Sequence, residues 1–449
     1  LWSYLSNYII KRRQQSTKLI FILLNSLGII PIIQFFVLIY LNSKVLTTGT
    51  SFNLLQIIII ILLFLFFYCI ISGTLFTYLS KQLSNTLNEN YIDKSYTFEA
   101  TGSFIGGLLI YLFFYTWFNT FQILLINFLT VLLLSFIIFD IRKYWIYSST
   151  FLVIITTIIV YSKPDYFIRK KQFKNHELIY YKDTNYGTLS ITKYYEEILF
   201  YKNNELLFST ENYIYNEEIT HYALSQRPNH KNILVLSGFI PGLIKEITKY
   251  NVSAIDYVEI DPNIYRISKE FMPSLKCKFN YIKTDPRRYV KTTTKKYDAI
   301  LINIPPPSTA GLNKYYTLEF FNETKKILSD NGIIIFSLPS TSNYLSKDIA
   351  YLNASIYKTL QKVFPFVIII PSSKNFFISS KEPLTFNILE NLEKQQIKTD
   401  YVNSFYYNND LIKLRIQTIL DSFPEKVKIN RDFYPISFLY QIKYWLNQI

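Results

Sequence analysis

Long apolar runs fill the first 163 residues of the chain. Five of them carry no charged residue: 19–41, 54–79, 103–117, 121–139 and 145–161. About 20 apolar residues at 1.5 Å per residue cross a hydrocarbon core of about 30 Å, so we interpret these runs as membrane helices. The shortest run, 145–161, also fits a buried core segment. Glycines at positions 102, 106 and 107 suit close packing of one helix against another.

Beyond Pro164 the apolar runs become shorter, and apolar and polar residues alternate more regularly. Alternation over 186–192, 197–201 and 206–208 predicts short antiparallel strands, with a tight turn at Asn203-Asn204. From residue 231 onward, apolar stretches alternate with helical patterns, which favours a mostly parallel sheet covered on both faces. These stretches are 233–236, 254–258, 299–302 and 332–336.

The pattern therefore predicts three parts. Residues 1–163 form a multi-pass α-helical membrane region, 164–226 a small β-rich region, and 227–449 an α/β Rossmann-like domain. The aromatic, amphipathic segment 438–445 leads back toward the membrane. Because the chain begins with Leu1 and not with Met, we expect it to be a piece of a longer protein.

Composition narrows the choice of partners. The net charge is +15, but lysines are scattered and form no RNA-binding signature or basic helix. We therefore expect a lipid bilayer as partner, and no nucleic acid. Cys69 and Cys277 stand alone, and the three histidines add no metal-ligand spacing, so neither a disulfide framework nor a metal is expected.

Candidate chemistry follows the strands, because ligands of doubly wound sheets bind beyond the carboxyl ends of the strands. Gly238 and Gly242 follow the first strand and fit either a nucleotide-binding turn or an ordinary strand-to-helix turn. Glu259 follows the second strand, where a carboxylate can accept from both ribose hydroxyls. Asp261 before Pro262 fits a helix N-cap.

Two further strand ends carry candidate residues. Asp285, after residues 280–282, can accept from an adenine amino group or cap a helix. The fourth strand ends in Asn303 and runs into Pro305-Pro306-Pro307. Because prolines cannot continue a strand, we predict a rigid loop that overhangs the pocket.

These residues together resemble the spermidine/spermine synthases in order and spacing. More narrowly, the chain is similar to bacterial membrane proteins that fuse such a domain to transmembrane helices. The segments that carry the resemblance are 186–187, 217–221, 233–242, 258–262, 285–287, 297–300, 316–321 and 331–332, with 99–107 and 430–435 similar to the fused subgroup. The resemblance covers most of residues 90–449.

The resemblance implies a class I S-adenosylmethionine-dependent methyltransferase-type fold. It also implies transfer of an aminopropyl group from decarboxylated S-adenosylmethionine to a polyamine or other amine. Glu259 would bind the ribose and Asp285 the adenine of that ligand, or of S-adenosylmethionine. For the amine the family uses a Tyr-His pair, and the candidates here are His221 and Tyr222, with Tyr316 as a further contact.

The chain departs from the family at three positions that carry the reaction. Ile240 stands where the family has the aspartate for the amino group of the adenosyl ligand, and Pro306 where it has the aspartate for the diamine. Asn303 takes the place of the acid/base aspartate, and an amide cannot accept a proton at neutral pH. The expected loss is on the order of 10²–10⁴ in rate.

Three functions follow as alternatives. The protein is an aminopropyltransferase with altered acceptor chemistry, a catalytically degenerate domain that acts as a membrane sensor or scaffold, or a methyltransferase on the same fold. The resemblance implies a multi-pass protein of the bacterial inner membrane and leaves a homo-oligomer open. Basic residues before the first run and between the last two mark the cytoplasmic face. Five crossings would then place the soluble domain outside, where adenosyl ligands are not expected, so its side stays undetermined.

Overall fold

The computed structural model describes residues 17–45, 54–87, 92–114, 117–138, 164–173, 175–238, 240–275, 277–340 and 346–447. The chain divides into two compact units, Leu1–Leu206 and Leu207–Ile449. This division falls inside strand β4 (Glu205–Ser209), whereas the boundaries predicted above lie near residues 163 and 226. The predicted helix 145–161 lies outside the described residues.

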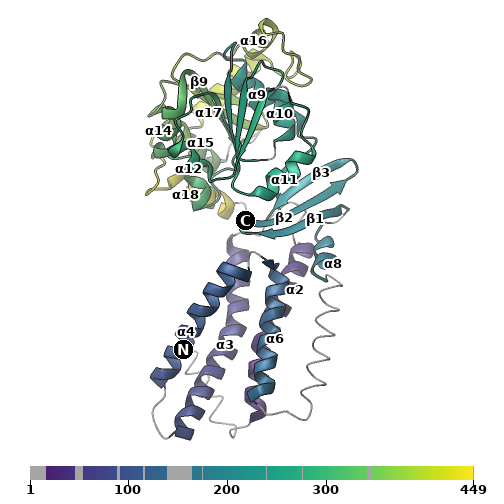
Figure 1. Ribbon diagram of the computed structural model, residues 1–449. Coiled ribbons are helices and arrows are strands. Elements are labelled where there is room, and N and C mark those ends of the chain that lie inside the picture. The colour runs from purple at the N-terminus through teal and green to yellow at the C-terminus, as the bar shows by residue number, and fades with distance from the viewer. Residues whose placement is uncertain are drawn as a thin grey trace. The chain divides into compact units, whose positions relative to one another are not determined.

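Apolar helices form most of the described part of the first unit (Figure 1). They are α2 (Thr17–Val45), α3 (Leu54–Leu87), α4 (Ile92–Leu109), which continues as the π-helical turn η1 (Ile110–Phe114), and α6 (Thr120–Ile138). The spans Leu19–Lys44, Leu55–Asn85 and Ile92–Phe114 are long and apolar enough to cross a membrane, and the apolar stretch of α6 is shorter. Helix α4 begins 11 residues before the predicted run at 103, because the polar residues before that run are helical too.

Contacts between these helices involve few polar groups. Gln34 of α2 donates from Nε2 to the carbonyl of Phe64 in α3 at 3.0 Å. At Gly28 of α2, an added Cβ would lie only 3.0 Å from Cδ2 of Phe128 in α6, so this glycine permits a close approach of two helices. Gly102, Gly106 and Gly107 have no described atom within 4 Å of an added Cβ. The predicted packing role of these three glycines is therefore wrong for the described part of the chain.

A short helix and a small sheet complete the first unit. These elements are α8 (Pro164–Lys170), β1 (Glu177–Thr184), β2 (Gly187–Tyr194) and β3 (Glu197–Lys202), and the sheet order is β1-β2-β3-β4. The strand pairs β1-β2 and β2-β3 are antiparallel. Asn203 and Asn204 connect β3 to β4 with φ angles of 51° and 71°. Two consecutive positive φ angles give the tight hairpin turn that the Asn-Asn pair predicted.

A seven-stranded sheet forms the centre of the second unit, in the order β10-β11-β9-β8-β5-β6-β7. The strands are β5 (Asn232–Leu236), β6 (Ala254–Val258), β7 (Lys278–Ile282), β8 (Tyr297–Ile302), β9 (Leu328–Pro339), β10 (Phe366–Pro371) and β11 (Lys374–Ser380). The five neighbouring strands β9, β8, β5, β6 and β7 are parallel to one another, whereas β11 runs antiparallel to both of its neighbours. This mixed sheet is the Rossmann-like fold that the sequence predicted, and its four apolar strands are confirmed as β5, β6, β8 and β9.

Helices cover both faces of this sheet (Figure 1). They are α9 (Tyr213–Leu224), α10 (Pro241–Ile247), α11 (Pro262–Glu270), α12 (Pro286–Thr292), α13 (Ala310–Asn313), α14 (Leu318–Ile327), α15 (Lys347–Gln361), α16 (Ile388–Lys394), α17 (Asn409–Asp421) and α18 (Ile436–Asn447). Successive residues of β5 enter different cores: Ile233 and Val235 lie in one cluster, Leu234 and Leu236 in the other. A strand buried on both faces reads as a continuous apolar run, which is why these strands were predictable.

One buried arginine ties the C-terminal segment to helices α12 and α14. Arg287 of α12 forms paired bonds to Glu323 of α14, at 2.9 and 3.0 Å, and to Asp432, at 2.7 Å each. Asp432 also accepts from the hydroxyl of Thr317 at 2.8 Å. Two-pronged contacts between arginine and carboxylate are among the strongest polar contacts in proteins. The segment around Asp432 is therefore a structural part of the second unit.

Candidate functional site

The turn between β5 and α10 has an unusual backbone. Ser237 and Gly238 both have left-handed conformations, with φ angles of 64° and 89°. Gly238 donates its N–H toward Glu259 at 3.2 Å, and its carbonyl accepts from the hydroxyl of Tyr257 at 2.7 Å. A Cβ at Gly238 would collide with the side chain of Asn303. Only glycine fits there, whereas Ser237 adopts its angle at a cost in strain.

Glu259 follows β6 and is only 1% exposed. Its Oε2 accepts from the hydroxyl of Ser237 at 2.5 Å, and its Oε1 accepts from the backbone N–H of Asp261 at 2.9 Å. Asp261 in turn caps α11 by accepting from the N–H of Asn263 at 2.9 Å, as predicted. A carboxylate in the place expected to contact a ribose is thus held by the chain itself.

Asp285 follows β7 and has two roles in the structure. Its Oδ1 caps α12 by accepting from the N–H groups of Arg287 and Arg288 at 2.9 and 3.1 Å. Its Oδ2 accepts from the ammonium of Lys314 at 2.5 Å and from the hydroxyl of Tyr315 at 3.1 Å. Burial opposes ionisation of Asp285, but the bonds from Lys314 and Arg288 outweigh it, so its pKa lies below the usual value.

Glu259 and Asp285 form what we call the carboxylate pair. Tyr315 donates its hydroxyl to Asp285 at 3.1 Å. Burial raises the pKa of the Tyr315 hydroxyl, and the charges of Asp285 and Glu259 raise it further. Strands β6 and β7 are neighbours and parallel, so the two carboxylates follow adjacent strands at one edge of the sheet. Phe239, a residue able to plug the space between them, lies outside the described residues.

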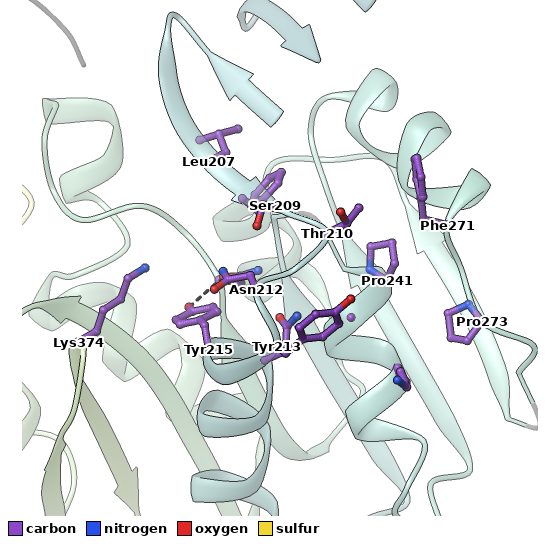
Figure 2. Close-up of a pocket in the computed structure, with 15 residues that line it drawn as sticks. Leu207, Ser209, Thr210, Asn212, Tyr213, Tyr215, Pro241, Phe271, Pro273 and Lys374 are labelled. Atoms are coloured by element: carbon purple, nitrogen blue, oxygen red, sulfur yellow. Dashed lines mark hydrogen bonds between the residues drawn. The ribbon is translucent and has the colours of Figure 1, made fainter. Parts of the chain in front are cut away.

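A pocket opens beside this edge, at the start of α9 and α10 (Figure 2). Its volume is about 240 Å³, and we call it the tyrosine pocket. The residues that line it are Leu207, Phe208, Ser209, Thr210, Asn212, Tyr213, Tyr215, Asn216, Pro241, Gly242, Lys245, Phe271, Pro273, Asn303 and Lys374. Sites for drug-sized ligands usually measure roughly 300–1,000 Å³. The tyrosine pocket is thus sized for a molecule of a few carbon atoms.

Tyr215 and Asn303 meet inside the tyrosine pocket. The hydroxyl of Tyr215 donates to Oδ1 of Asn303 at 3.1 Å, the dashed line in Figure 2. Burial raises the pKa of Tyr215 to about 12, with the bond to Ser337 opposing and the charge of Glu218 adding to the shift. At neutral pH this hydroxyl is a hydrogen-bond donor. Since the Asn303 amide cannot take up a proton either, the Tyr215–Asn303 pair can form hydrogen bonds but cannot serve as a base.

Lys374, at the start of β11, reaches the same wall of the pocket (Figure 2). Its ammonium lies 4.4 Å from the centre of the Tyr215 ring, which is a favourable cation–π contact. Lys374 as a whole is exposed, yet the protein groups around its ammonium still disfavour the charged form. This desolvation lowers the pKa of Lys374, and the charge of Glu218 only partly opposes the shift.

The three residues predicted to bind substrate do not line the tyrosine pocket. His221 is fully buried between Glu246 and the hydroxyl of Tyr250, at 2.9 Å from each. Tyr316 donates to the carbonyl of Ile304 at 2.7 Å and so holds the proline loop. Tyr222 packs in the core, with its hydroxyl 3.2 Å from Oε1 of Glu218. In this structure all three stabilise the fold around the site.

Glu218 lies one helical turn beyond Tyr215 on α9 and is fully buried. Its Oε1 accepts from the hydroxyls of Tyr222 and Tyr406, at 3.2 and 3.0 Å. Burial raises the pKa of Glu218, and the surrounding hydroxyls only partly offset this. Burial therefore weakens the negative charge behind the pocket wall.

Comparison with known proteins finds a family that resembles part of this chain. The spermine/spermidine synthase domain matches residues 212–386. The resemblance to the spermidine/spermine synthases is thereby confirmed for this part of the chain. The chain is 28% identical over 249 residues to polyamine aminopropyltransferase 2 of Aquifex aeolicus, which covers 52% of this chain and 49% of that protein.

Two further relatives carry the name polyamine aminopropyltransferase. The relative from Methanocaldococcus jannaschii is 31% identical over 167 residues, covering 35% of this chain and 57% of that protein. The relative from Clostridium beijerinckii is 28% identical over 251 residues, covering 52% and 85%. The chain thus spans about half the length of two of these three relatives. Residues 1–206, which include the apolar helices, lie outside the matched synthase domain.

Within the synthase domain, the structure brings together Gly242 and Asn303 at the tyrosine pocket, with Gly238 packed against Asn303. Ile240 is fully buried at the N-cap position of α10, where its side chain makes no capping bond. Sequence reasoning missed Tyr215, Asn216 and Lys374. Tyr215 and Asn216 are a tyrosine followed by a polar residue, as in the family's Tyr-His pair, whereas His221 and Tyr222 have the reverse order. This order of residue types was the available signal.

Proposed function

We propose that the second unit binds an adenosyl sulfonium ligand on the carboxylate pair and transfers its aminopropyl group to a small acceptor in the tyrosine pocket. The observation that carries this proposal is the position of the two carboxylates after adjacent parallel strands. The relatives named above support the reaction type by their names.

In this reaction the lone pair of the acceptor amine forms a C–N bond to the propyl carbon beside the sulfonium. The C–S bond breaks, its electrons stay on sulfur, and methylthioadenosine leaves as a neutral thioether. The amine must also lose a proton. No carboxylate lines the tyrosine pocket, so the acceptor must bind as the free amine and the rate should rise with pH.

A degenerate, ligand-binding role is the second candidate, and a specific observation favours it. The hydroxyl of Ser237 already donates to Glu259, and the ammonium of Lys314 already donates to Asp285. An adenosyl ligand must displace both donors before the carboxylate pair can accept from its ribose and adenine. The protein would then act as a sensor or scaffold that binds the ligand without turning it over.

A titration separates the two candidates. The full chain in detergent is titrated by calorimetry with decarboxylated S-adenosylmethionine, S-adenosylmethionine and methylthioadenosine, and methylthioadenosine release is then measured with an amine present. Binding with release supports the transferase, and binding without release supports the sensor or scaffold. If none of the three ligands binds, the proposed adenosyl site is wrong.

We further propose that the first unit is embedded in a bilayer as a multi-pass region, in a bacterial inner membrane. The support is the exposed apolar surface of α3 and α4, where Leu62 and Phe104 are 63% and 72% exposed. Such surface is stable against lipid but not against water. Protease protection of the second unit in oriented vesicles tests the side on which it lies. Release of the chain by carbonate washing would refute the embedding.

A further inference from the structure

The tyrosine pocket differs in charge from a site for a dication. None of its 15 lining residues is Asp or Glu, and two of them, Lys245 and Lys374, are cationic. Two of the positions where the resemblance calls for aspartates are occupied by Asn303 and Pro306. A diamine in this pocket would bring an ammonium toward two others, without a lining carboxylate to compensate.

Lys374 is the cation best placed to act on a ligand. Its ammonium lies over the ring of Tyr215, whose hydroxyl bonds Asn303, so it stands beside the predicted reaction centre. Within the described part of the chain, neither Lys374 nor Lys245 forms an ion pair with a carboxylate. The charge of Glu218 acts on Lys374, but the two groups form no ion pair among the described residues, and burial disfavours the charged form of Glu218. The ammonium of Lys374 therefore has capacity for an anionic partner.

The pocket also offers neutral donors for an anion. Ser209 and Thr210 bring hydroxyls from the end of β4, and Asn212 and Asn216 bring amides from the start of α9. A carboxylate or phosphate can accept from several such donors at once, whereas an ammonium can only donate. Charge-assisted bonds of this kind are about twice as strong as neutral ones.

We propose that the tyrosine pocket binds a small ligand that carries an anionic group, a carboxylate or a phosphate, where the relatives' polyamine would carry a second ammonium. This rests on the proposed function for the reaction itself, but the binding preference can be measured apart from it. The anionic group has two sources. It belongs either to the acceptor, as in an amino acid, or to the amino acid part of S-adenosylmethionine, which the decarboxylated ligand lacks.

Three compounds of equal length test the preference. The full chain in detergent, with and without saturating methylthioadenosine, is titrated with 4-aminobutanoate, butylamine and 1,4-diaminobutane, which differ only in the charge of one end. We expect 4-aminobutanoate to bind at least tenfold more tightly than the diamine, with butylamine between them. 3-Aminopropyl phosphate distinguishes phosphate from carboxylate. Tighter binding of the diamine than of 4-aminobutanoate would overturn the proposal.

Substitutions at Lys374 test the assignment. Lys374→Met should lower the affinity for 4-aminobutanoate at least tenfold and leave the affinity for butylamine unchanged. Lys374→Arg should keep most of the preference for 4-aminobutanoate over the diamine. Lys381, which pairs with Asp330 at 3.2 Å, provides the matched control Lys381→Met. Unchanged butylamine binding shows that the variant is folded. An unaltered order of the three compounds in Lys374→Met would contradict the role of this lysine.

Binding of the two adenosyl ligands shows which molecule carries the anionic group. If Lys374→Met weakens S-adenosylmethionine but not its decarboxylated form, the carboxylate belongs to the donor, and the pocket still binds an anion. If no adenosyl ligand binds at all, the proposed function fails. The titrations without methylthioadenosine still decide the anion preference, so the two failures can be told apart.

Discussion

The carboxylate pair and the tyrosine pocket lie in one domain, but they keep different parts of the family's chemistry. Glu259 and Asp285 are the residue types that the resemblance predicts, and each also has a structural role. Glu259 binds the turn after β5, and Asp285 caps α12. Asn303, by contrast, has a hydrogen bond from Tyr215 and no capping role. A carboxylate that also stabilises the fold can be retained after ligand binding is lost. Residues without a structural role are therefore better indicators of function.

The largest expected effect comes from restoring the missing acid/base group. Asn303→Asp should raise the single-turnover rate of methylthioadenosine release by on the order of 10²–10⁴, the usual contribution of a positioned proton acceptor. Asn303→Leu, similar in size but unable to accept a proton, is the control. An equal rate in both variants would mean that the pocket differs from an active synthase in more than this residue.

Weakening the carboxylate pair separates its two roles. Asp285→Asn should weaken adenosyl ligands by about 10- to 100-fold, the effect of losing a hydrogen bond to a charged group. Its effect on the melting temperature should be small, because Asn caps a helix as well as Asp does. Calorimetry and thermal unfolding of the same preparations measure both. Full affinity in this variant would show that Asp285 is only a cap.

Ser237 competes with the ligand, so its removal should strengthen binding. Ser237→Gly should tighten adenosyl ligands roughly fivefold, the worth of one net hydrogen bond of about 1 kcal/mol. The stability of the ligand-free fold should change little, because glycine adopts a φ of 64° without strain and this offsets the lost hydrogen bond to Glu259. Ser237→Ala loses the same bond but keeps the strain, so it should bind the ligand more tightly and lower the melting temperature. Weaker binding in both variants would mean that the hydroxyl contacts the ligand.

The smallest effect concerns the charge behind the pocket wall. The pKa of Glu218 is raised above its ordinary value of 4.5, so stability is fully present below that pH and is lost as pH rises through the folded-state pKa. Glu218→Gln should remove this loss. The variant should match the wild type near pH 4 and exceed it by on the order of 1 kcal/mol above the folded-state pKa, in urea unfolding. The exposed Glu393→Gln is the control for the loss of one carboxylate at the surface.

Sequence reasoning found the strands of the large sheet because burial on both faces leaves an unbroken apolar signal, as in β5 and β8. It also found the N-caps at Asp261 and Asp285, where Asp-Pro is a local signature. Strand β11 was not predicted, and so Lys374 was missed. No local pattern brings a residue at the start of β11 next to one on α9, since that proximity depends on the order of strands in the sheet.

The start of α4 was missed for a different reason. Residues 92–102 are polar or mixed, and a helix there has no apolar stripe to reveal it. His221 and Tyr222 were proposed because the resemblance calls for a Tyr-His pair at the amine. Their neighbours Glu246 and Glu218 satisfy them inside the fold, and only three-dimensional contacts can distinguish such a partner from a substrate.

Arg287 gives the end of the chain an influence on the carboxylate pair. Its guanidinium binds Asp432 and also donates to the carbonyl of Lys314 at 3.2 Å, and Lys314 is the residue that neutralises Asp285. A cut before Asp432 would leave the arginine with half of its counter-charge and loosen the lysine that screens Asp285. The C-terminal segment thereby stabilises the surroundings of the carboxylate pair. Binding assays should therefore use the whole chain and not a shortened one.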